Sequence, residues 1–287
     1  MSTGGRGRAV AVVTDSTAGL PEEQVAAHRL TVVPLTVTID SASGREGIDV
    51  APEDVAKALV ARRSSVTTSR PSPGEFTEAY GRLLDEGAAG VVSVHLSAKL
   101  SGTLESARLA ADGYPGRVAV VDSRSTGMGL GFCAIAAGGF TELAPAAEAA
   151  RAAAGRITTL FYVDTLEYLR RGGRIGAASA LLGTALSVKP ILHMVDGEIV
   201  VRDKVRTASR ALARLVDLAV EAAGDAEVEV GVHHLAAPER AEELVVRLRE
   251  RLGERIQGWY LTEIGAAVGA HVGPGLASIV VHTRSTD

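Results

Sequence analysis

Short apolar runs alternate with amphipathic stretches along the first half of the chain. Runs rich in β-branched residues cover 8–13, 30–39, 91–96 and 117–121, and each leads through polar residues into a helix-like period. Strands of a parallel sheet have this appearance because helices cover both faces of the sheet. The alternation therefore predicts an α/β fold whose first sheet is mainly parallel and flanked by helices.

Helix-start signals place several helices within this pattern. Ser72 with Glu75 matches a capping box, and Pro73 stands at the first helical position. Asp164 with Glu167 gives the same spacing before a short helix that ends near Arg171. Residues 40–47 are expected to form a loop. The predicted helices of the first half include 52–61, 73–86, 127–139 and 144–154.

A second set of elements begins after Gly155. Asp196-Gly197 between two apolar runs is a strong signal for a two-residue hairpin. We therefore expect two α/β domains, residues 8–154 and 155–287, after a disordered tail at 1–7. The predicted strands of the second half are 157–163, 189–194, 198–202, 227–234, 255–261 and 278–282, and its helices include 177–185, 238–252 and 265–271.

Composition limits the class of protein. The chain is 46% hydrophobic but only 3% aromatic, and its net charge is −4, so an aliphatic core is expected and a nucleic-acid surface is not. The single cysteine, Cys133, excludes an internal disulfide and favours a reducing compartment, the cytoplasm. No apolar run has the length of a membrane span.

Hydroxyl-rich loops follow several predicted strands, at 15–17, 67–68, 97 and 122–123. Loops at the carboxyl ends of parallel strands gather at one sheet edge, where ligands bind. Ser97, Ser101 and Thr103 stand before a helix N-terminus, which favours an anion. A purely structural interpretation is equally strong, with Ser101 as an N-cap and Ser97 in a turn.

Other chemistries receive less support from the sequence. Adjacent His233 and His234 face opposite sides of a strand, so no metal site is expected. The glycines at 127–131 do not have the spacing of a dinucleotide fingerprint. Two alternatives stay open: an acyl hydrolase or transferase with Ser97 as nucleophile and His271 as base, and a binder of a small phosphorylated metabolite.

Seven stretches, taken together, resemble the DegV family of bacterial fatty-acid-binding proteins. They keep their order over almost the whole chain, at 12–17, 67–74, 96–103, 172–175, 189–192, 204–207 and 269–275. The resemblance implies two domains with one long-chain fatty acid buried at their interface, and no cofactor.

The resemblance also implies which residues hold the ligand. Thr68, Ser97 and His271 would hold the carboxylate, with Thr67 and Ser101 as further donors nearby.

The family serves as the acyl-carrier partner of fatty acid kinase, so the resemblance implies a protein without catalysis of its own. The kinase would convert the presented carboxylate into an acyl phosphate. Basic residues are expected to face that partner or, transiently, a membrane surface: Arg170, Arg171, Arg202, Lys204 and Arg206. Arg174 is interpreted instead as a residue whose hydrogen bonds stabilise the fold.

Overall fold

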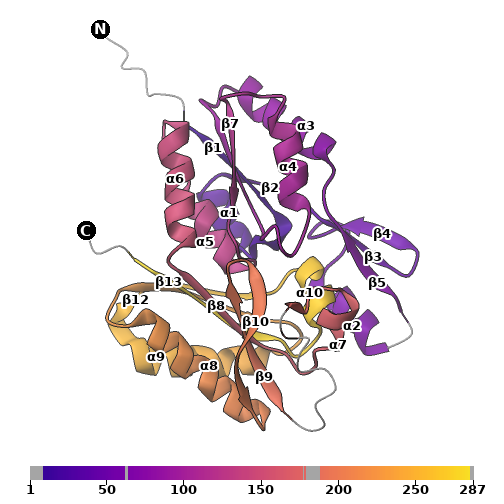
Figure 1. The fold of residues 1–287 in the computed structure, drawn as a ribbon, viewed down its shortest axis with the longest axis vertical. Coiled ribbons are helices and arrows are strands. Elements are labelled where there is room, and N and C mark those ends of the chain that lie inside the picture. The colour runs from indigo at the N-terminus through magenta and orange to yellow at the C-terminus, as the bar shows by residue number, and fades with distance from the viewer. Residues whose placement is uncertain (1–8, 62–63, 177, 179–187, 285–287) are drawn as a thin grey trace.

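The fold is α/β, with two larger sheets at opposite ends of an elongated molecule (Figure 1). The computed structural model describes residues 9–61, 64–176, 178 and 188–284. The predicted tail at 1–7 and most of the predicted helix at 177–185 lie outside these residues. Among the described residues, no helix has both the length and the apolar character needed to cross a membrane.

The parallel sheet predicted for the first half is confirmed. Its strands are β1 (Ala11–Asp15), β2 (Leu30–Val33), β6 (Val91–His95) and β7 (Val118–Asp122), in the order β2-β1-β6-β7. Every residue of β6 is buried, as expected for a strand covered on both faces. Apolar residues of the sheet pack with α3 and α4 in one cluster, and with α5 and α6 in another. These helices are α3 (Pro73–Asp85), α4 (Thr103–Ala111), α5 (Met128–Ala136) and α6 (Leu143–Ala154), and α1 (Glu22–Ala27) precedes β2.

One of the two predicted capping boxes forms. The Ser72 hydroxyl accepts from the backbone N–H of Glu75, whose carboxylate accepts from Ser72 in return. The box predicted at Asp164 and Glu167 is wrong for α7 (Glu167–Arg171). The Asp164 carboxylate instead accepts from the Tyr162 hydroxyl at 2.6 Å and pairs with Arg240, so it is not available to cap the helix.

The single strand predicted for 30–39 is also wrong. Pro34 lacks an N–H for a sheet ladder and separates β2 from β3 (Thr36–Ile39), which belongs to another sheet. That antiparallel sheet has the order β4-β3-β5, with β4 (Ala42–Arg45) and β5 (Val66–Ser69). The predicted loop at 40–47 therefore contains a strand, and Thr67 and Thr68 lie within a strand rather than in a loop.

The second large sheet has six strands in the order β10-β9-β8-β13-β11-β12. All its neighbouring strands are antiparallel except β11 and β12. Asp196 and Gly197 both have positive φ at the tip of the predicted hairpin, which is confirmed. The strands are β8 (Ile157–Tyr162), β9 (Lys189–Val195), β10 (Glu198–Val205), β11 (Val228–His234), β12 (Ile256–Glu263) and β13 (Ala277–Thr283).

Helices α8 (Ala208–Ala223) and α9 (Pro238–Leu252) pack on the six-stranded sheet and bury its largest apolar cluster. Met128 and Phe132 of α5 join Val280 of β13 in a smaller cluster between the two large sheets. The six-stranded sheet thus has helices of the second half on one side and the parallel-sheet part of the molecule on the other (Figure 1).

The segment from 34 to 69 crosses from the first large sheet toward the second half of the chain. It contains α2 (Pro52–Ala61), whose predicted bounds are confirmed. Its apolar side chains, among them Leu35, Val37 and Val55, pack with alanines of α10 (Ala266–Val272). Residue 155 separates the two large sheets, but this segment joins both halves, so the domain limits 8–154 and 155–287 stay a prediction.

Candidate functional site

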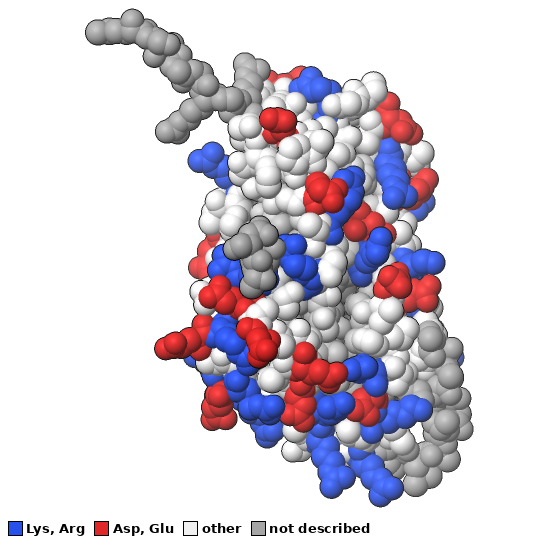
Figure 2. Space-filling view, turned by 60° about the vertical axis from the view of Figure 1, so that its left-hand side comes forward, with Lys and Arg blue, Asp and Glu red and all other residues white. Residues whose placement is uncertain are grey.

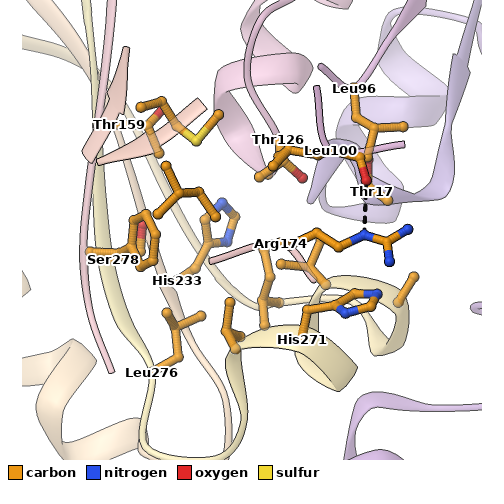
Figure 3. A pocket seen from close by; sticks show the side chains of 18 of the residues that line it. Thr17, Leu96, Leu100, Thr126, Thr159, Arg174, His233, His271, Leu276 and Ser278 are labelled. Atoms are coloured by element: carbon orange, nitrogen blue, oxygen red, sulfur yellow. Dashed lines mark hydrogen bonds between the residues drawn. The ribbon is translucent and has the colours of Figure 1, made fainter. Parts of the chain in front are cut away.

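A mainly apolar cavity lies between the loops of the parallel sheet and the inner side of the six-stranded sheet (Figure 3). Its open volume is about 820 Å³ when its mouth is included. The loops after β1, β6 and β7 all reach it, as expected for the carboxyl ends of parallel strands. Its apolar lining includes Leu96, Phe161, Met194, Ile199, Val268 and Leu276.

Polar side chains from distant parts of the sequence meet at one end of this cavity. Thr68 of β5 and His271 of α10 line it, and the Thr68 hydroxyl lies 2.8 Å from Nε2 of His271. Ser101 and Arg174 line the cavity as well. Figure 3 shows Arg174 and His271 together, on the side of the cavity opposite Thr159 and Ser278. The structure therefore brings two predicted site residues, Thr68 and His271, into contact, and it places a third, Ser101, on the wall of the same cavity.

His271 is a neutral group at this end of the cavity near pH 7. Burial, with a smaller contribution from the charge of Arg174, lowers the pKa of His271 to about 4. In its Nε2–H form, the imidazole donates to Thr68, whose own hydroxyl hydrogen is then available for a ligand. A Cβ at Gly172 would overlap Nδ1 of His271, so the close approach requires glycine there.

Arg174 has the fold-stabilising hydrogen bonds that the sequence predicted, and it also lines the cavity. Its Nε donates to the carbonyl of Leu100 at 3.0 Å, and Nη1 donates to the carbonyl of Gly172. These two bonds fix the guanidinium between the loop after β6 and the loop after α7. Its place in the cavity was not predicted from the sequence, although Arg174 lies within one of the seven matching stretches.

Ser97 and Thr67 do not line the cavity. The buried Ser97 hydroxyl donates to the carbonyl of Gly197 at 2.7 Å and accepts from the N–H of Lys99. Thr67 is exposed, because successive residues of a strand face opposite sides and Thr68 faces inward. Carboxylate binding by Ser97 or Thr67 thus stays a prediction, and for Ser97 it requires release of the Gly197 carbonyl.

The nucleophile–base pair predicted for an acyl hydrolase does not form. Ser97 bonds to Gly197, whereas His271 bonds to Thr68, so no hydrogen bond connects Ser97 with His271. A nucleophilic serine needs its base within hydrogen-bond reach. The geometry of the described residues therefore gives no support to this alternative.

A buried network that the sequence did not reveal lies beneath the cavity. The Asp15 carboxylate lies 2.9 Å from Nδ1 of His95, whose Nε2 lies 2.6 Å from the Ser93 hydroxyl. All three side chains are fully buried, and Tyr80 donates to Ser93, so no substrate reaches this hydroxyl. Asp15 also accepts from Thr17, which lines the cavity. The network acts as a structural support for the cavity wall.

His233 of β11 connects the six-stranded sheet with the start of α5 and, through Thr262, with the loop after β1. The N–H of Met128 donates to Nε2 at 2.9 Å, so Nδ1 carries the hydrogen and donates to Thr262 at 2.8 Å. The Thr262 hydroxyl donates in turn to the carbonyl of Gly19. Burial lowers the pKa of His233 to about 4, which keeps it neutral as these bonds require. Among the described residues, no cluster of His, Cys, Asp or Glu could hold a metal ion.

The basic residues predicted to face a partner are exposed, and three of them pair with carboxylates. Arg170 and Arg171 share Glu167, each at 2.7 Å. Arg202 pairs with Glu221 at 3.1 Å. Figure 2 shows Lys and Arg mixed with Asp and Glu on the face that it displays. Lys204 and Arg206 are exposed, and the structure assigns them no ion pair among the described residues.

Comparison with known proteins places the chain in a family. The model of the DegV family, described as "Uncharacterised protein, DegV family", matches residues 9–284, and the chain belongs to this family. A DegV domain-containing protein of Streptomyces coelicolor is 50% identical over 283 residues, which cover 96% of this chain and 99% of that protein.

Two solved structures share the fold over nearly the whole chain. One is described as showing fatty acid binding of a DegV family protein from Thermus thermophilus, with a TM-score of 0.87 and 31% identity. The other is DegV, a fatty acid binding protein from Bacillus subtilis, with a TM-score of 0.87 and 30% identity. Each comparison covers 96% of this chain and 100% of the other.

Proposed function

We propose that this chain binds one long-chain fatty acid in the cavity and presents its carboxylate to a fatty acid kinase. The observation that carries the proposal is the division of the cavity wall: Arg174 and His271 stand together at one end, Thr68 lies within hydrogen-bond distance of His271, and most of the remaining wall is aliphatic. The fatty acid binding described for the two structural neighbours supports the same ligand.

The physical chemistry of the ligand matches this division. Burial of roughly 14 methylenes at ~0.8 kcal/mol each gives a gross gain of about 11 kcal/mol before entropy costs. A buried carboxylate is costly unless it is paired and hydrogen-bonded. The Arg174 guanidinium and the Thr68 hydroxyl are suitable donors, and a charge-assisted hydrogen bond is the stronger kind.

The kinase step extends the proposal to a partner. The protein would act in the cytoplasm without chemistry of its own, and the kinase would form the acyl phosphate on the bound ligand. A transient contact with a membrane surface would supply the fatty acid. Exposed Lys204 and Arg206 are the residues we assign to a negatively charged partner surface.

The ligand is tested by mass spectrometry of organic extracts of the purified protein, which should release a fatty acid in about one equivalent. Thr68→Val removes the hydroxyl but keeps the shape, and we expect about tenfold weaker stearate binding by the delipidated protein. Thr67→Val is the matched control, because it makes the same change on the outer side of β5.

Unchanged affinity in Thr68→Val would contradict the assigned head-group end. A water-soluble phosphorylated compound in place of a fatty acid would contradict the proposed ligand itself.

A further inference from the structure

Two arginines from distant parts of the chain bond to the same short stretch of the loop after β6. Arg174, which lines the cavity, donates from Nε to the carbonyl of Leu100. Arg70 donates from Nη1 to the carbonyl of Gly102 at 3.2 Å. Carbonyls two residues apart are separated by no more than about 7 Å, and Ser101 between them is on the cavity wall. The two guanidinium groups therefore lie near each other, one in the cavity and one beside it.

Arg70 lies on the solvent side of the predicted carboxylate end. It precedes Pro71, which favours an extended backbone, and it follows Thr68 by two residues, so both side chains face the same side. Thr68 lines the cavity and contacts His271, whereas Arg70 is exposed. The Arg70 side chain packs directly on Gly102, where a Cβ would overlap the guanidinium. Arg70 is thus held at the edge of the cavity and stays open to solvent.

Neither guanidinium has a carboxylate partner within the described part of the chain. None of the ion pairs there includes Arg70 or Arg174. Arg70 also lies where α4 begins, and the positive end of the helix dipole adds to the repulsion. A fatty acid carries one negative charge and balances one arginine only. The second positive charge fits a ligand with a further negative charge.

We propose that Arg70 binds the phosphoryl group of the acyl phosphate that the kinase forms on the bound fatty acid. This inference rests on the proposed function and assigns a residue to its product. In the transfer, a carboxylate oxygen bonds to the γ-phosphorus of ATP, the bond from that phosphorus to ADP breaks, and no proton is released or taken up.

The charge and the position of the product both fit Arg70. A phosphoryl group on oxygen carries about two negative charges near pH 7, so the product has about one more than the fatty acid. The added group stands beyond the carboxylate, away from the hydrocarbon chain, which is the side of Arg70. A guanidinium can bind phosphate through two parallel hydrogen bonds. Arg70 would therefore favour the product over the unreacted fatty acid, while Arg174, Thr68 and His271 hold the acyl oxygens.

A stable analogue of the product tests this inference without a kinase. In the β-ketophosphonate analogue of stearoyl phosphate, a methylene group replaces the oxygen between the carbonyl carbon and phosphorus. Delipidated protein is mixed with this analogue and stearate in equal amounts, and native mass spectrometry counts the two complexes. In Arg70→Gln, we expect the ratio of analogue to stearate complexes to be at least about fivefold lower than in the wild type, with unchanged stearate affinity.

Further measurements separate this role from general effects of charge. Arg70→Lys keeps the charge but loses the planar fork, and it should keep part of the preference for the analogue. Arg108→Gln removes an exposed positive charge from the other end of α4 and should leave the ratio unchanged. Vesicles of phosphatidylglycerol offer a phosphoryl group from another source, and Arg70→Gln should bind them as the wild type does.

Several outcomes would overturn the inference alone. They are an unchanged ratio in Arg70→Gln, an equal fall in Arg108→Gln, and an equal loss of both ligands in Arg70→Gln, which would show a merely structural role. Weaker vesicle binding by Arg70→Gln with an unchanged ratio would assign Arg70 to a lipid surface instead. Failure of the wild type to bind stearate would overturn the proposed function and this inference with it.

Discussion

At the scale of single residues, a buried histidine stabilises the structure only in its neutral form. His233 is 1% exposed, and its hydrogen bond from Met128 requires an unprotonated Nε2. The folded-state pKa of about 4 lies below the ordinary value of about 6.5, so the unfolded chain binds the proton more readily. The stability due to neutral His233 is therefore complete above about pH 6.5 and is lost as the pH falls toward 4.

This linkage predicts a pH-dependent free energy of unfolding. Urea unfolding at pH 7.5 and pH 5 should show a loss of about 2 kcal/mol attributable to His233. In His233→Gln, which cannot titrate, the difference between the two pH values should shrink by about that amount. His28→Gln is the control, since His28 is exposed. An unchanged pH difference in His233→Gln would contradict the assignment.

Single residues also show the limits of the sequence argument. Thr68, Ser101 and His271 were predicted for the site, and the structure places all three on the cavity wall. Ser97 was predicted with equal reason, yet its hydroxyl bonds to Gly197, 100 residues away. The group to which a hydroxyl such as that of Ser97 bonds is determined by tertiary contacts. The local sequence does not contain this information.

At the scale of elements, the β9–β10 hairpin connects the second half to the loops of the parallel sheet. Its tip makes three contacts there: Gly197 with Ser97, Glu198 with Lys99 at 3.5 Å, and Asp196 with Arg124 at 3.8 Å. Only the Ser97 contact is buried. Exposed ion pairs contribute little, so this hydrogen bond should hold the tip.

Removal of the buried contact should therefore cost more than removal of an exposed one. Ser97→Ala leaves the Gly197 carbonyl without its donor, and we expect a loss of about 1–3 kcal/mol in the free energy of unfolding. Lys99→Ala breaks the ion pair at the same tip and should cost less than about 1 kcal/mol. Equal losses in the two variants, measured by urea unfolding, would count against a special role for Ser97.

Most elements were predictable because their signals are local. The hairpin at Asp196-Gly197 and the capping box at Ser72 depend on residues a few positions apart. The apolar run at 30–39 misled the prediction, although Pro34 offered a visible warning. The Asp164 carboxylate was engaged by Arg240, 76 residues away, which no capping pattern can reveal.

At the scale of the whole molecule, the proposed function requires a surface that the fatty acid kinase can contact. The formal charge is −4, and the face displayed in Figure 2 carries both signs, so attraction to a negatively charged kinase would be local. Lys204 and Arg206 are the two predicted basic residues without a carboxylate in the described ion pairs. Both are exposed and lie outside the cavity wall.

Reversal of these two charges tests the partner surface. In Lys204→Glu with Arg206→Glu, we expect at least about tenfold slower acyl-phosphate formation with ATP, Mg²⁺ and the organism's own fatty acid kinase. The content of bound fatty acid should stay unchanged. Arg82→Glu, at an exposed position of α3, controls for a general change of charge. Loss of the lipid would show that the residues are structural, and an unchanged rate would remove them from the partner surface.

Because the 34–69 segment crosses between the two halves, a division of the chain after residue 154 separates residues that meet at the head-group end of the cavity. Thr68 comes with the first half, whereas Arg174 and His271 come with the second. A fragment that ends at residue 154 would inherit the threonine without its histidine, and the complementary fragment the reverse. Chimeras with a relative would likewise join two unmatched halves of the head-group end, unless residues 34–69 are exchanged together with the second half.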